Sequence, residues 1–117
     1  MAHHTMKLNP TSFDKIAAGT KTIELRLWDK KRQQFSAGDT VTFTRLPDKT
    51  QSLTRTIVKI VHAPTFQELL QKVNPLDCGY QPQDLDGIES GHHGIYDIYT
   101  PEDEKKYGVV GICLNHE

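Results

Sequence analysis

The chain has 117 residues, a length that can bury one hydrophobic core, so we expect a single domain over residues 1–117. Its 14 basic and 15 acidic residues give a net charge of −1, which argues against a broad basic surface that grips long nucleic acid by charge alone. No apolar run approaches the roughly 20 residues of a membrane-spanning helix, and the first residues lack the apolar core of a secretory signal, so we expect a cytoplasmic protein with no membrane partner.

The first predicted elements are a short strand and a helix. Residues 6–9 form the strand, which Pro10 is expected to end. In the helix that follows, Thr11 is the predicted N-cap and Asp14 its capping-box partner. The apolar residues of this helix share one face. Gly19 suits the left-handed position that follows a helix, so we expect the helix to end there.

Residues 22–28 alternate apolar and polar side chains, which predicts a strand. Its apolar residues point to one side of the sheet. Glu24, Arg26 and Trp28 point to the other side. The polar stretch after this strand is expected to be a loop that ends in a turn at Gly38.

Two further strands are predicted over residues 40–46 and 53–62, joined by a turn at Pro47. The second is apolar on both faces at its centre, as in a strand that is buried on both sides or bends across a barrel. A helix over residues 65–73 follows, because Thr65 begins a capping box and apolar residues then recur at helical spacing.

Residues 74–99 are rich in Pro, Gly, Asp and His, and we expect a long irregular segment that is functional or mobile. Tyr96 and Tyr99 either close over a ligand or anchor this segment, and we favour the anchor. A short helix is predicted to begin at Pro101, a residue suited to the first helical position, and to end at Gly108. A buried strand then closes the chain.

The predicted order is strand, helix, three or more strands, helix, long loop, short helix and strand. Parallel βαβ folds alternate strands and helices strictly, and this order does not. Consecutive strands joined by short turns therefore predict an α+β fold. We expect a mixed or antiparallel sheet of five or six strands that closes into a barrel, with two or three short helices.

Three ionic side chains follow the first predicted helix within a few residues. Lys21 lies at the junction of helix and strand, and Glu24 and Arg26 share one strand face about 6.6–6.8 Å apart along the strand. They either neutralise one another as an ion-pair ladder on the surface or line a pocket for an anionic or heteroaromatic ligand. In such a pocket, arginine acts as a planar fork and lysine as a point charge.

The pattern G-x-K-x-x-E-x-R, formed here by Gly19, Lys21, Glu24 and Arg26, resembles the signature of the ASCH family. The helix before the pattern, the turn at Gly38 and the closing sequence KYGVVGI are also similar to that family. The resemblance implies a PUA-like β-barrel with a cleft. It also implies that the partner is RNA, a nucleoside or a nucleotide.

The resemblance further implies a possible enzyme, since some ASCH relatives are amidohydrolases that deacetylate acetylcytidine and others are described as ribonucleases. In the amidohydrolases a lysine matches Lys21, a threonine stands where this chain has Glu24, and a separate glutamate completes the site. Glu104 and Glu102 are the nearest candidates for that glutamate by chain order. The candidate catalytic residues are therefore Lys21, Glu24 and Glu104.

The charge state of Lys21 separates catalysis from binding. If Lys21 is desolvated beside Arg26, its pKa falls and it can act as a base or nucleophile. If it pairs with Glu24 it stays charged, which suits binding better.

A second basic feature follows the predicted strand, where Lys30, Lys31 and Arg32 are consecutive and Trp28 is close by. Basic side chains can hold phosphates while an aromatic ring stacks on a base. The alternative is a solvated loop, with Trp28 as a core residue. The candidate binding residues are Lys21, Glu24, Arg26, Trp28, Lys31 and Arg32.

We expect neither a metal nor a cofactor. Cys78 and Cys113 form no CxxC pair and match no zinc-ligand spacing. They either form one disulfide or remain free, and free thiols suit a reducing cytoplasm. His92 and His93 are metal ligands by type, but their spacing to nearby carboxylates matches no metal motif.

Three functions remain open from the sequence. The first is an RNA- or nucleotide-binding module, the second a small hydrolase acting on a modified nucleoside or on RNA, and the third a regulatory interaction domain without nucleic acid. No obligate protein partner is evident.

Overall fold

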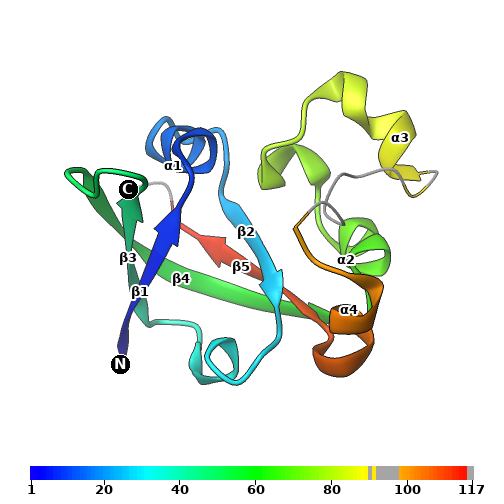
Figure 1. Ribbon diagram of the computed structural model, residues 1–117, viewed down its shortest axis with the longest axis horizontal. Helices are drawn as coiled ribbons and strands as arrows, with labels where there is room; N and C mark the ends of the chain where they lie inside the picture. Colours follow the sequence, from blue (N-terminus) through cyan, green and yellow to red (C-terminus); the bar gives the residue numbers. More distant parts are fainter. Residues whose placement is uncertain (90, 92–97, 116–117) are drawn as a thin grey trace.

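A five-stranded mixed sheet curls into a half-barrel (Figure 1). The computed structural model describes residues 1–89, 91 and 98–115. The strands in sheet order are β1 (His3–Leu8), β3 (Thr40–Arg45), β4 (Ser52–Ala63), β5 (Val109–Leu114) and β2 (Ile23–Leu27). β1 pairs with β3 in parallel, and the remaining neighbours pair antiparallel. The predicted α+β class and mixed sheet are confirmed, and β1 and β2 are the two edges of the sheet.

In the described residues, four short helices cover the half-barrel: α1 (Pro10–Ala17), α2 (Phe66–Lys72), α3 (Leu85–Glu89) and α4 (Pro101–Tyr107). α1 lies where β1 ends and β2 begins, whereas α2, α3 and α4 gather beyond β2 and β5 (Figure 1). Single 3₁₀ turns occupy Arg32–Gln34, Pro75–Cys78 and Pro82–Asp84. No helix in the described part of the chain is long and apolar enough to cross a membrane.

The start of α1 differs from the prediction. Asn9, not Thr11, is the N-cap, and its side-chain oxygen accepts a hydrogen bond from the Ser12 amide at 2.8 Å. Pro10 begins the helix, because a proline at the first helical position loses no intrahelical hydrogen bond. The capping box with Asp14 is therefore wrong. Gly19 has φ +82° just after the helix, as predicted.

The segment predicted to be irregular over residues 74–99 contains α3 and two 3₁₀ turns, so that prediction is wrong for its described part. Each 3₁₀ turn begins at a proline, and a polar side chain accepts an amide hydrogen bond close by. Asn74 accepts from the Leu76 amide at 3.0 Å, and Asp84 accepts from the Gln81 amide at 2.7 Å. Such short turns leave no periodic signal in the sequence. His92, His93 and Tyr96 lie outside the described residues.

Two hydrophobic clusters lie on the two faces of the sheet. The cluster inside the half-barrel includes Phe43, Ile57, Val110 and Ile112. The cluster under α2 includes Leu25 of β2 together with residues of α2 and α3. Because successive side chains of a strand point to opposite faces, β2 and β5 contribute to both sides of the sheet.

Candidate functional site

Glu24 and Arg26 stand on the inner face of the half-barrel. In the register of β2 and β5, Glu24 lies opposite Ile112 and Arg26 lies opposite Val110. Residues directly opposite each other in an antiparallel pair point to the same face, and both β5 residues belong to the core inside the half-barrel. Two charged side chains thus share a face with core residues, beside the open edge of the sheet.

The predicted ionic side chains form a buried triad, which we call the motif triad (Lys21, Glu24 and Arg26). Glu24 Oε1 lies 2.8 Å from Lys21 Nζ, and Glu24 Oε2 accepts a hydrogen bond from Arg26 Nε at 2.8 Å. Lys21 Nζ is also 3.4 Å from Ser12 Oγ. These side chains therefore form a buried ion-paired group and not a ladder on the surface, and they line a cavity. That the cavity holds a ligand stays a prediction.

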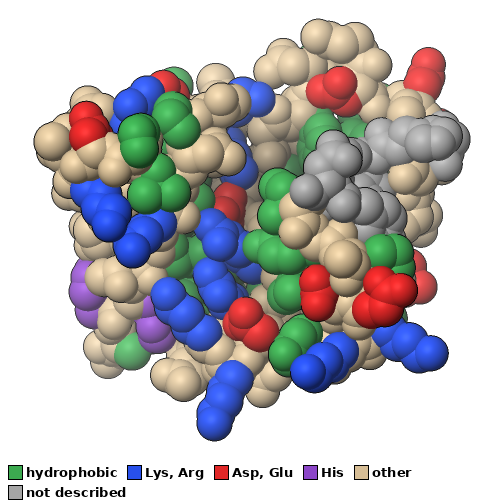
Figure 2. Space-filling model, viewed as in Figure 1, with side chains coloured by type: hydrophobic (Ala, Val, Ile, Leu, Met, Phe, Trp, Pro, Cys, Tyr) green, Lys and Arg blue, Asp and Glu red, His purple; other side chains and the backbone are tan. Residues whose placement is uncertain are grey.

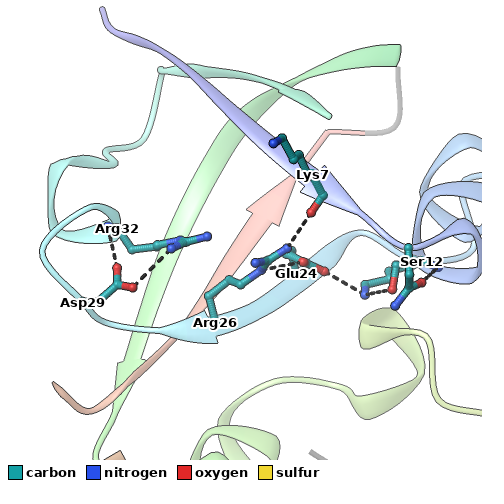
Figure 3. A network of polar contacts seen from close by, with 8 residues as sticks. Lys7, Ser12, Glu24, Arg26, Asp29 and Arg32 are labelled. Atoms are coloured by element: carbon teal, nitrogen blue, oxygen red, sulfur yellow. Dashed lines mark hydrogen bonds and ion pairs between the residues drawn. The ribbon is translucent and has the colours of Figure 1, made fainter. Parts of the chain in front are cut away.

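Arg26 joins the two edges of the sheet. Its Nη2 donates a hydrogen bond to the carbonyl oxygen of Lys7 on β1 at 3.2 Å, and Figure 3 shows the guanidinium lying between that carbonyl and Glu24. The half-barrel is therefore linked by a side chain at the place where its edge strands do not pair.

Glu24 is ionised by its partners. Burial alone would raise the pKa of the Glu24 carboxyl, but the charges of Lys21 and Arg26 and their hydrogen bonds outweigh it and hold that pKa below its ordinary value. Burial works against the charge of Arg26 too, but Glu24 and the Tyr99 hydroxyl outweigh it and raise the pKa of the guanidinium. A carboxylate held in this way is a weak proton acceptor near neutral pH.

A cavity of about 410 Å³ lies beside the triad, and we call it the motif cavity. This volume falls within the range of small-molecule sites. Polar side chains beside the triad and an apolar wall line it, among them Lys7, Asn9, Ser12, Leu8, Leu25 and Leu46. In the space-filling view, Lys and Arg side chains gather along a hollow in the middle of the molecule, with an acidic side chain inside it (Figure 2).

The segment after α2 supplies the other wall of the motif cavity, through Cys78, Tyr80, Ile98 and Tyr99. The Tyr99 ring stacks on Phe66 with a centroid distance of 5.6 Å, so Tyr99 both anchors its segment and faces the cavity. Burial raises the pKa of the Cys78 thiol to about 12 and that of Tyr80 to about 12, and both groups are uncharged at neutral pH. Cys78 and Cys113 are free thiols, as expected.

A second hollow, also of about 410 Å³, adjoins the first, and we call it the basic hollow. It is lined by Thr5, Met6, Lys7, Arg26, Lys31, Arg32 and Thr44. Lys7 and Arg26 line both spaces. The predicted binding residues Lys31 and Arg32 therefore line the same hollow as Arg26.

Trp28 lies elsewhere, although it was grouped with the basic loop. Its ring packs edge-on against His62 at 4.1 Å and partly against the core inside the half-barrel. It lines a different, shallow hollow together with Lys59. This placement favours the alternative expectation, in which Trp28 is a core residue.

Glu104 also lies apart from the motif triad. Its side chain is buried, and Oε2 accepts a hydrogen bond from the Phe66 amide at 2.7 Å, where α2 begins. Glu104 is not among the described residues that line the motif cavity or the basic hollow. Its carboxylate therefore ties α4 to α2.

Sequence reasoning missed Lys7, Asn9, Ser12 and Tyr80 as cavity residues. One local indication in the sequence pointed to Lys7, since it is a charged residue within a short predicted strand. The position of that strand beside β2 was not visible, since the two edge strands share no ladder. No group of three possible metal ligands occurs in the part of the chain that the structure describes.

Comparison with known proteins identifies one family and several solved structures with a similar fold. The model of the ASCH domain family matches residues 6–116. The crystal structure of hypothetical protein PH0355 is 32% identical, with a TM-score of 0.78 and 97% of each chain covered. The solution structure of protein PF0455 from Pyrococcus furiosus is 31% identical, with a TM-score of 0.69, and covers 97% of this chain and 96% of that chain.

A more distant structure shares the fold alone. A mutant of the ASCH protein from Zymomonas mobilis is 13% identical, with a TM-score of 0.67, and covers 100% of this chain and 72% of that chain. No curated protein matches the sequence.

Proposed function

Since this chain belongs to the ASCH domain family, we propose that it binds RNA or a nucleotide at the motif cavity. The observation that carries the proposal is the motif triad. Three ionic side chains meet beside a cavity of about 410 Å³, and two of them, Glu24 and Arg26, stand on a face that otherwise holds core residues. Burying charge is costly, so a triad kept in such a place points to recognition of a ligand.

The lining of the motif cavity suits a single nucleotide unit. RNA recognition commonly places an unstacked base against aromatic rings and reads the donors and acceptors on its edges. Tyr80 and Tyr99 supply rings, while Asn9 and Lys21 supply polar groups. Because the net charge of the chain is −1, the protein as a whole does not attract an anionic ligand, and this local group of cations would have to supply the attraction.

Binding ranks ahead of catalysis because of Glu24. Both oxygens of its carboxylate are engaged, one by Lys21 and one by Arg26, and its pKa is lowered. A general base works best with a pKa near the working pH. The paired Glu24 is therefore better suited to holding Lys21 and Arg26 in place than to removing a proton.

One contact supports a hydrolase as second candidate. Lys21 Nζ lies 3.4 Å from Ser12 Oγ, and both line the motif cavity. Lys21 donates to the Ser12 hydroxyl in this contact; only a neutral Lys21 amine could accept the hydroxyl proton, as a lysine base does beside a serine nucleophile. Incubation with N4-acetylcytidine, followed by chromatographic measurement of cytidine, tests this candidate. Release that Lys21→Ala abolishes would place the hydrolase first.

The binding proposal is tested by ligand-induced thermal shift, since a ligand that binds only the folded state raises Tm. The probes are the four ribonucleosides, their monophosphates, N4-acetylcytidine and five-nucleotide RNAs. We expect at least one probe to raise Tm, and Lys21→Gln to remove that shift. The matched control is Lys59→Gln, which removes the same charge from an exposed side chain outside the motif cavity.

A screen without any shift would contradict the proposal and favour a regulatory interaction domain that holds no nucleic acid. An undiminished shift in Lys21→Gln would place the ligand elsewhere on the protein.

A further inference from the structure

We propose that the basic hollow holds a phosphate of the bound nucleotide, so that the ligand is a nucleoside phosphate, free or within RNA, and not a free nucleoside. This inference rests on the proposed function, because it takes the motif cavity as the place of the nucleoside.

The charge of the basic hollow is the first reason. Four of its seven described lining residues are Lys or Arg, and none is Asp or Glu. These cations come from β1, from β2 and from the loop with its 3₁₀ turn at Arg32–Gln34. The fold therefore gathers them from separate parts of a chain whose net charge is −1.

The second reason is the position of the hollow beside the motif cavity. Lys7 and Arg26 line both spaces. Arg26 is fixed between them, since Nε donates to Glu24 and Nη2 donates to the Lys7 carbonyl. A nucleoside in the motif cavity thus has the basic hollow next to it, and the phosphate of a nucleotide is attached to that nucleoside through the sugar.

The third reason is the state of Arg32. Asp29 orients it, with one carboxylate oxygen accepting from the Arg32 amide at 3.1 Å and the other from Nη1 at 3.2 Å (Figure 3). Arg32 Nε is buried and has no hydrogen-bond partner among the described residues. A buried donor without a partner is unfavourable. Phosphate oxygens match a guanidinium well, and Arg32 is among the residues that line the hollow.

The number of cations favours phosphate over a carboxylate. A single carboxylate offers two oxygens and one negative charge to a hollow with four cationic side chains, two of which, Arg26 and Arg32, already pair with Glu24 and Asp29. A terminal phosphate offers three acceptor oxygens and close to two negative charges near neutral pH, whereas a phosphodiester within RNA carries one charge. The threonines at the rim, Thr5 and Thr44, add hydroxyl donors.

The experiment compares each ribonucleoside with its 5′- and 3′-monophosphate by titration calorimetry at about 50 mM salt, where screening is weak. We expect one monophosphate to bind about tenfold tighter than its nucleoside, which corresponds to about 1.4 kcal/mol. A five-nucleotide RNA of the preferred base distinguishes a phosphate inside a strand from a terminal one. The advantage of the monophosphate should fall as salt is raised.

The variants Lys31→Gln and Arg32→Gln, alone and together, assign the advantage to the hollow. We expect the double variant to reduce the ratio of nucleoside to monophosphate Kd below about threefold. Lys30→Gln is the matched control, because it removes the same charge from an exposed neighbour that does not line the hollow. Circular dichroism checks folding, and Lys31→Gln alone changes an exposed side chain, so it tests the assignment even if Arg32→Gln misfolds.

The outcomes separate the two proposals. If nucleosides bind and their monophosphates bind no tighter, the phosphate site is wrong and the proposed function stands. A tenfold advantage that survives in Lys31→Gln/Arg32→Gln also overturns the phosphate site. If no nucleoside, nucleotide or RNA binds, both proposals fall.

Discussion

Two glutamates of this protein are equally buried, each 4% exposed, and yet they lie in contrasting regions. Glu24 stands between Lys21 and Arg26 at the wall of the motif cavity. Glu104 lies between α4 and α2, where it accepts the Phe66 amide, and lines neither of the two spaces. Burial of a carboxylate therefore does not identify a site by itself. Its partners and the space beside it do.

The two regions hold a buried carboxyl group in different ways. At Glu104, Oε2 accepts a hydrogen bond from the Phe66 amide in the first turn of α2, where backbone amides have no partner within the helix. At Glu24, two side-chain cations leave water as well, and such buried ion groups are often no more stable than apolar residues of similar volume. The first arrangement suits stability. The second suits a function that needs fixed charges beside a cavity.

The largest expected effect comes from Glu24→Ala, because it leaves Lys21 and Arg26 buried without their shared partner. We expect a loss of about 3–5 kcal/mol in the free energy of unfolding, measured by urea denaturation. The control replaces the whole triad, as Lys21→Met/Glu24→Leu/Arg26→Met. This variant should recover most of that loss and still bind no nucleotide. A triple variant as unstable as Glu24→Ala would show that the triad is structural.

Glu104→Ala should have a smaller effect on stability. Removing the carboxylate leaves the buried Phe66 amide without that acceptor, and we expect a loss of about 1–3 kcal/mol in the free energy of unfolding. Glu102→Ala, on an exposed position of the same helix, should stay within about 0.5 kcal/mol of the original protein. The Tm shift caused by a bound nucleotide should persist in Glu104→Ala. If binding is lost while stability is kept, Glu104 belongs to the site and the contrast with Glu24 fails.

The sequence predicted the local part of this contrast well. Gly19 ends the helix before the triad, and alternation placed Glu24 and Arg26 on one strand face. The helix at Thr65 and the closing strand were also predicted, since caps and apolar runs act over a few residues. Each of these features depends on neighbours in the chain.

The features that the sequence did not predict depend either on residues far away in the chain or on a choice between two similar local alternatives. Lys7 reaches the site because β1 and β2 are the two edges of a curved sheet, which no local pattern encodes. Asn9 and Thr11 are both good caps, and Pro10 decides between them by taking the first helical position. The place of Glu104 in the chain does not reveal that its side chain turns toward α2.

The smallest predicted effect concerns pH. The pKa of Glu24 is lowered in the fold from its ordinary value of 4.5, so its ionised form stabilises the native state above that pH. This contribution is lost as the pH falls through the folded-state pKa. Between about pH 5 and pH 3, the free energy of unfolding should therefore fall less steeply in Glu24→Gln than in the original protein, as urea titrations at each pH would measure.

The variant should keep part of the slope, because the hydrogen bond with His4 also lowers the pKa of Asp39. Glu102→Gln, which removes a carboxylate from an exposed position, should follow the original protein. If the free energy of unfolding of Glu24→Gln fell with pH as steeply as that of the original protein, ionisation of Glu24 would not stabilise the folded state. Lys21 and Arg26 would then not act on its charge, and the distinction between the two buried glutamates would rest on cavity position alone.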